Sequence, residues 1–99
     1  MEITLVQQGG FAGLTMRRHV DTARLASAEA AMVEAMVNGC SFFAIPDVPP
    51  KRPPVADRYL YRLTVDDGPR KHTVMMMDGA LPPGAEPLLD WLQRQPPER

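Results

Sequence analysis

The segment from residue 58 to residue 77 constrains the fold most, because it has the pattern of two strands joined by a turn. Alternate positions in its first half are apolar or aromatic, which is typical of a strand buried on one face. These positions are Tyr59, Tyr61, Leu63 and Val65. Asp66-Asp67-Gly68-Pro69 favours a turn, and residues 72–77 return as a second strand. We therefore expect an antiparallel sheet with one buried face and one solvated face.

A second hairpin is predicted near the start of the chain. Residues 2–7 and 14–21 alternate well enough for strands, and Gly9-Gly10-Phe11-Ala12-Gly13 lies between them. Glycine permits positive φ and close backbone approach, so a turn of about five residues can join the strands tightly. Phe11 contributes nothing to a turn; it either folds back onto the core or is offered to a partner. Arg18 interrupts the apolar row of the second strand, where we expect a bulge or partial solvation.

Two helices are predicted from apolar side chains at helical spacing. We expect the first to have Ser27 as its N-cap and Gly39 at its C′ position, with Phe42 and Phe43 closing its end against the core. The second has Pro87 in its first turn. The predicted apolar stripes are Met32, Val33, Met36 and Val37, then Leu88, Leu89, Trp91 and Leu92.

These elements predict an α+β fold of order ββαββα, a four-stranded antiparallel sheet with two helices packed on one face. A length of 99 residues indicates a single domain spanning residues 1–99. The chain has eleven prolines, and five of them fall within residues 46–54. That segment favours extended polyproline II and cannot pair as a central strand.

Composition narrows the classes of partner and compartment. The net charge is −1, which argues against nucleic acid or an anionic membrane as the main partner. No apolar run approaches the ~18 residues of a membrane helix, and the first residues lack the pattern of a signal peptide. Cys40 is the single cysteine, so no internal disulfide forms. We expect a reduced, cytoplasmic chain.

The inventory of reactive side chains argues against an enzyme. His19 and His72 lie on separate predicted strands and, with Cys40, form no recognisable zinc spacing; solvated strand histidines are the simpler interpretation. Cys40 follows a helix C-terminus and is expected to be a buried, unreactive thiol. Neither Ser27 nor Ser41 has a base nearby in the sequence. We predict no catalytic residues, no metal and no cofactor.

Several segments, taken in order and spacing, resemble the emfourin (protealysin-inhibitor) family of small cytoplasmic proteins that inhibit thermolysin-like zinc metalloproteases. They are Gly9-Gly10-Phe11-Ala12-Gly13, Phe42-Phe43-Ala44-Ile45-Pro46, Asp57-Arg58-Tyr59-Leu60-Tyr61, Leu63-Thr64-Val65-Asp66-Asp67-Gly68, His72-Thr73-Val74, Asp78-Gly79-Ala80 and Pro87-Leu88-Leu89-Asp90-Trp91-Leu92. The resemblance spans nearly the whole chain. It departs from the family pattern at residues 75–77, which are all methionine, and in the segment Pro50-Lys51-Arg52-Pro53-Pro54.

The resemblance implies a monomeric protein that blocks the active-site cleft of such a protease. Its implied protease-contact residues are Gly9, Gly10, Phe11, Ala12, Gly13, Asp57 and Arg58. Phe11 would fill the pocket for a large hydrophobic side chain just after the scissile bond, and glycines would lower the ordering cost of binding. The Asp57 carboxylate, or a backbone carbonyl, is the candidate to approach the zinc. The proline-rich segment is a further candidate contact.

Two other classes of function stay open on the sequence. One is a non-catalytic interaction module that binds a protein partner through its sheet face or its proline-rich segment. The other is a nucleic-acid binder that stacks bases on Tyr59 and Tyr61 beside Arg58 and Arg62. The absence of a basic excess favours core tyrosines flanked by solvated arginines.

Overall fold

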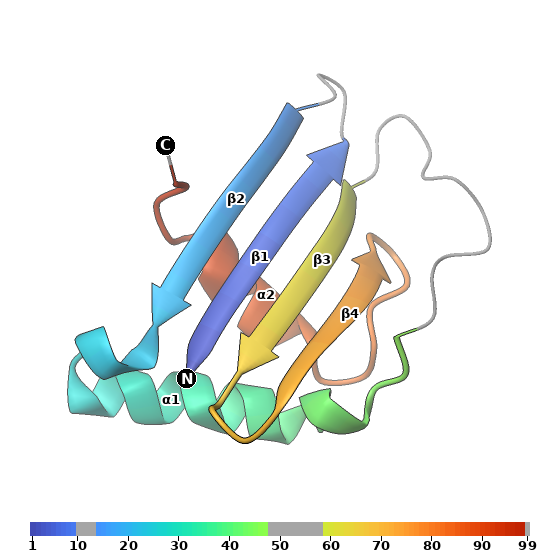
Figure 1. The fold of residues 1–99 in the computed structure, drawn as a ribbon. Coiled ribbons are helices and arrows are strands. Elements are labelled where there is room, and N and C mark those ends of the chain that lie inside the picture. Colours follow the sequence, from blue (N-terminus) through green and yellow to red (C-terminus); the bar gives the residue numbers. More distant parts are fainter. Residues whose placement is uncertain (10–13, 48–58, 99) are drawn as a thin grey trace.

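The computed structural model describes residues 1–9, 14–47 and 59–98; residues 10–13, 48–58 and 99 lie outside the description. Its centre is an antiparallel sheet in the order β2-β1-β3-β4 (Figure 1). The strands are β1 (Glu2–Gly9), β2 (Leu14–Asp21), β3 (Tyr59–Asp66) and β4 (Lys71–Met77). The helices are α1 (Ser27–Gly39) and α2 (Glu86–Gln93), with short 3₁₀ turns η1 (Thr22–Arg24) and η2 (Phe42–Ala44). The predicted ββαββα order is confirmed.

Both helices lie on the same face of the sheet, as predicted (Figure 1). The core between the layers collects the odd-numbered positions of β1 and β3 and the apolar side of each helix. Its sheet residues are Ile3, Leu5, Val20, Tyr61, Leu63, Val65, Val74 and Met76. Its helix residues are Val33, Val37, Leu88, Leu89, Trp91 and Leu92. No helix in the described ranges is long and apolar enough to cross a bilayer.

Arg18 differs from its predicted environment. The β1–β2 register runs without interruption from Glu2 opposite Asp21 to Gly9 opposite Leu14, so β2 has no bulge. Arg18 points toward the helices and is only 7% exposed. Its Nε donates a hydrogen bond to the Gln95 carbonyl at 2.9 Å. The expectation of partial solvation was wrong because the segment after α2 covers this part of the strand.

The two ends of α1 also differ from the prediction. Ser27 is the first residue of the helix, and Ala26 precedes it as an N-cap without a side-chain hydrogen bond. Gly39 is the last helical residue, whereas the left-handed conformation belongs to Ser41, at φ 50°. The left-handed residue lies two positions later than expected, directly before η2. In this position the turn lets Phe42, which is 1% exposed, pack against the core.

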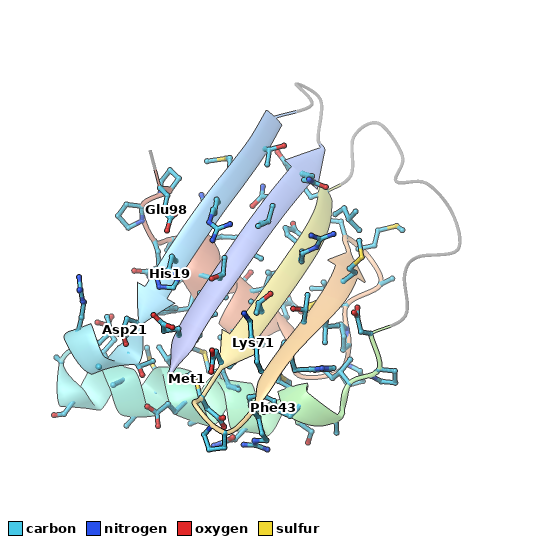
Figure 2. The ribbon with its side chains drawn as sticks, viewed as in Figure 1. Met1, His19, Asp21, Phe43, Lys71 and Glu98 are labelled. Atoms are coloured by element: carbon cyan, nitrogen blue, oxygen red, sulfur yellow. The ribbon has the colours of Figure 1, made fainter. Side chains whose placement is uncertain are left out.

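His72 corrects the expectation that both histidines face solvent. It lies on the helix side of β4, and its Nε2 is 2.6 Å from the Ile45 carbonyl oxygen. Its ring meets that of Phe42 at a centroid distance of 5.6 Å. His19 lies on the opposite face and is exposed, as expected (Figure 2).

Candidate functional site

Both segments that the sequence singles out for protease contact join the sheet at one edge. Gly9 ends β1, and its register partners are Leu14, which begins β2, and Tyr59, which begins β3. The chain therefore leaves β1 for residues 10–13, returns from them into β2, and enters β3 after residues 48–58, at three neighbouring strand ends (Figure 1). Gly9 has φ +97°, a conformation that glycine adopts far more readily than other residues. We call this edge of the sheet the Gly9–Tyr59 edge.

Of the seven predicted contact residues, the structure places Gly9. The other six lie outside the described residues: Gly10, Phe11, Ala12, Gly13, Asp57 and Arg58. Most of the proline-rich segment predicted over residues 46–54 lies outside them as well. The described residues establish the arrangement of the strand ends to which these segments connect.

Hydrogen bonds connect the strands next to these ends with each other and with α2. The Tyr59 carbonyl accepts from the backbone N–H of Asp78 at 3.0 Å. The hydroxyl of Tyr61, a residue 3% exposed, donates to Asp78 Oδ1 at 3.4 Å and accepts from Gln93 Nε2 at 3.2 Å. Burial is the main reason that the pKa of this phenol is raised above its usual value of 10.0. Polar groups bonded to one another inside the fold hold the strand ends in a defined arrangement.

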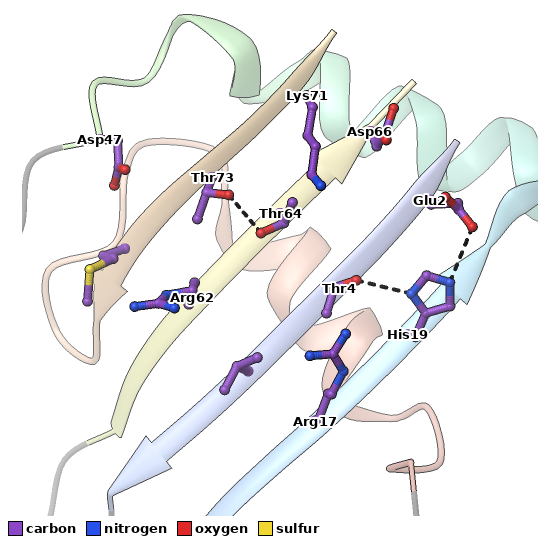
Figure 3. A pocket seen from close by; sticks show the side chains of 12 residues that line it. Glu2, Thr4, Arg17, His19, Asp47, Arg62, Thr64, Asp66, Lys71 and Thr73 are labelled. Atoms are coloured by element: carbon purple, nitrogen blue, oxygen red, sulfur yellow. Dashed lines mark hydrogen bonds and ion pairs between the residues drawn. The ribbon is translucent and has the colours of Figure 1, made fainter. Parts of the chain in front are cut away.

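The face of the sheet away from the helices is open and hollowed. The concavity has a volume of about 460 Å³ and is lined from all four strands and Asp47 (Figure 3). The strand register arranges its side chains in rows across the sheet. The acidic row is Asp21, Glu2, Asp66 and Lys71; the threonine row is His19, Thr4, Thr64 and Thr73; the arginine row is Arg17, Val6, Arg62 and Met75.

Some of these side chains are paired within the face, and others are not. The Thr4 hydroxyl lies 3.0 Å from His19 Nδ1, and His19 Nε2 lies 3.7 Å from Glu2 Oε1 (Figure 3). The hydroxyls of Thr64 and Thr73 are 2.8 Å apart. Within the described residues, neither Arg62 nor Lys71 forms an ion pair within 4.0 Å. Asp47 and Asp66 line the same face and likewise form no ion pair within the described residues. The open face therefore presents charged groups of both signs to a partner.

The reactive residues of the described ranges do not converge on a metal. His19 lies on the open face, whereas Cys40 and His72 lie on the helix side. No group of three or more His, Cys, Asp and Glu side chains could hold a metal ion among the residues described. Cys40 is buried, as predicted, and burial raises the pKa of its thiol above 9.0. A raised pKa leaves the thiol protonated and unreactive at neutral pH.

Two features of the site were not predicted from the sequence. The pairing of Gly9 with Tyr59 joins segments about 50 residues apart, and no local pattern indicates which strands become neighbours. The rows of the open face also depend on that pairing. The alternation of Arg17 with His19 and of Arg62 with Thr64 was visible as a one-sided polar pattern, but it did not indicate the row that each residue would join.

The position of Tyr61 bears on the alternative of a nucleic-acid binder. The residue is 3% exposed, which argues against base stacking on its ring.

Comparison with models of known protein families gives a match over most of the chain. The family model described as Emfourin matches residues 5–93, about nine-tenths of the chain. The matched region runs from β1 to the end of α2 and contains both segments that connect at the Gly9–Tyr59 edge. No curated protein and no solved structure matches this chain.

Proposed function

This chain belongs to the emfourin family, whose members are protein inhibitors of proteases, and we propose that it inhibits a thermolysin-like zinc metalloprotease by blocking the active-site cleft. In this proposal the protein is a cytoplasmic monomer without catalytic activity of its own. The partner class follows from the family, and the choice of a thermolysin-like enzyme follows from the motifs that resemble its inhibitors.

The proposed contact is made by residues 9–13 together with Asp57 and Arg58. The observation that supports it is the pairing of Gly9 with both Leu14 and Tyr59. Because these strand ends are neighbours, two segments distant in sequence can enter the same cleft. Strand ends held in a sheet leave less conformational freedom to lose on binding, which favours affinity.

The chemistry assigns different roles to the two segments. Phe11 would occupy the hydrophobic pocket that receives the side chain after the scissile bond. The Asp57 carboxylate, or a backbone carbonyl of either segment, would approach the zinc, whose protein ligands include carboxylate oxygens. The segment over residues 46–54 would add contact at the rim of the cleft.

The test is a titration of the protein into a thermolysin-like protease that is cleaving a peptide substrate. We expect inhibition that is competitive with substrate. Phe11→Ala should weaken inhibition about thirtyfold or more while leaving the melting temperature unchanged, because an anchoring aromatic contributes ~2 kcal/mol or more. Met32→Ala is the matched control, since Met32 is 44% exposed on α1, which packs on the helix side of the sheet.

Three results would contradict the proposal. Wild-type protein that leaves several thermolysin-like proteases fully active would refute the function itself. Noncompetitive inhibition would place the contact outside the cleft. A Phe11→Ala variant that loses inhibition only because its melting temperature falls would assign Phe11 to the core.

A further inference from the structure

We propose that the arginine row of the open sheet face is a second contact with the protease, and that it meets an acidic surface beside the active-site cleft. This inference rests on the proposed function, because it extends the contact from the Gly9–Tyr59 edge onto the adjoining face. It commits to one occupant, the protease itself.

The first argument for a second contact is the size of a typical stable interface, which exceeds the contact proposed so far. Specific protein–protein interfaces bury about 800 Å² on each partner and use roughly 20–30 residues a side. The proposed contact so far comprises seven residues in the cleft and the nine residues of segment 46–54 at its rim, sixteen together, which is below that range. The seven are Gly9, Gly10, Phe11, Ala12, Gly13, Asp57 and Arg58. A tight complex therefore needs surface next to the edge. On one side of the sheet that surface is covered by the helices, so the open face is the larger area available.

The arginine row lies close enough to the Gly9–Tyr59 edge for one partner to contact both. Val6 is three residues from Gly9 along β1, which corresponds to roughly 10 Å in a strand. Between them, Leu60 and Met77 are register partners and half-buried on the same face. With Val6 and Met75, they form a partly apolar surface around the exposed Arg62. Apolar contacts beside an arginine are typical of protein-binding surfaces.

The sign of the side-chain charge changes along the open face. The arginine row adjoins the edge, and the acidic row lies two rows further away, roughly 13 Å along the strands. Arg62 forms no ion pair within the described residues, while Arg17 shares its charge with Glu98 at 3.1 Å. Among the charged side chains that the strands contribute to this face, a partner bound at the edge therefore meets Arg62 before the carboxylates of the acidic row. Complementary charge of this kind raises association rates and selects the partner.

The test compares two reversals of charge that change the net charge equally. Arg62→Glu places the change in the arginine row, whereas Arg24→Glu places it on η1, beyond the far end of the sheet. Association and dissociation rates with the protease would be measured from about 0.02 M to about 0.5 M salt. We expect Arg62→Glu to slow association about tenfold or more at low salt and to reduce its salt dependence. Arg24→Glu should change the rate less than about threefold.

The outcomes separate this inference from the function on which it rests. Equal effects of Arg62→Glu and Arg24→Glu, with wild-type inhibition intact, would overturn the second contact and leave the inhibitor function standing. Absence of wild-type inhibition would refute both. As a second measurement, the amide NMR signals of Val6, Arg62 and Met75 should broaden or shift with bound protease. Unchanged signals at these three residues, in a complex that forms, would also overturn the second contact.

Discussion

Arg18 is a charged residue in a buried environment, because its guanidinium group lies on the helix-covered face of the sheet. Its Nη1 has no hydrogen-bond partner among the described residues, and its Nε bonds to a carbonyl and not to a carboxylate. Replacing a buried charge by an apolar side chain of similar length is often neutral or stabilising. We expect Arg18→Met to stay within about 1 kcal/mol of the wild-type free energy of unfolding.

The control for Arg18→Met is Arg18→Ala, which removes the aliphatic stem as well as the charge. It should destabilise by about 2 kcal/mol or more, because the packed stem leaves a cavity. Urea unfolding measures both variants. Equal losses in the two would show that the guanidinium, and not the stem, stabilises the fold.

The Asp67 carboxylate predicts how stability responds to acid. Hydrogen bonds from the Arg70 side chain and backbone N–H hold the pKa of Asp67 below its ordinary value of 3.8. Because the folded-state pKa is the lower one, this carboxylate stabilises the fold above about pH 4, and the contribution is lost as the pH falls through the folded-state pKa. The stability difference between wild type and Asp67→Asn should therefore shrink toward zero in acid. Urea midpoints from about pH 2 to about pH 6 would show a constant difference if the pair were irrelevant.

At the scale of elements, the C-terminal end of α1 gives a test of which residue there is left-handed, Gly39 or Ser41. Gly39 is helical, and a Cβ added there would have nothing within 4 Å. Gly39→Ala should therefore stabilise the protein by about 0.5–1 kcal/mol. Ser41 holds φ at 50°, so Ser41→Gly should relieve part of a cost of roughly 1–2 kcal/mol.

Thermal or urea unfolding of these two variants distinguishes the observed end of α1 from the end expected on the sequence. If Gly39 were the left-handed C′ residue, Gly39→Ala would be destabilising and Ser41→Gly would bring no gain. The sign of the Gly39→Ala effect is opposite in the two cases, and the Ser41→Gly gain occurs in only one of them, so the two variants together identify the observed end.

Element type and order were predictable because the signals are local. The alternation of residues 59–65 and the stripe of Leu88, Leu89, Trp91 and Leu92 each indicate one face of one element. The predictions for Arg18 and His72 failed because their environments depend on contacts from elsewhere in the chain. Arg18 is covered by the segment after α2, and His72 is enclosed by η2.

For the whole molecule, we predict a single cooperative unfolding transition. The sheet, α1 and α2 contribute to one buried cluster, so no element keeps a core of its own when another is lost. Trp91, the only tryptophan, reports on α2 against the sheet, and far-UV circular dichroism reports on all elements. The two urea transitions should coincide. A separate, earlier change in tryptophan fluorescence would show that α2 unfolds independently.

The sequence by itself determined the ββαββα order, the one-sided burial of the sheet and the family, because periodicity, turn residues and motif spacing are read along the chain. Tertiary structure alone decided that Gly9 pairs with Tyr59, that Arg62 and Arg17 share a row, and that Arg18 is buried. Strand neighbours and register result from packing the whole core at once, and a shift of one residue would exchange the two faces of a strand. For that reason the predicted contact residues were chosen from the sequence, but the common edge that unites their segments required the fold.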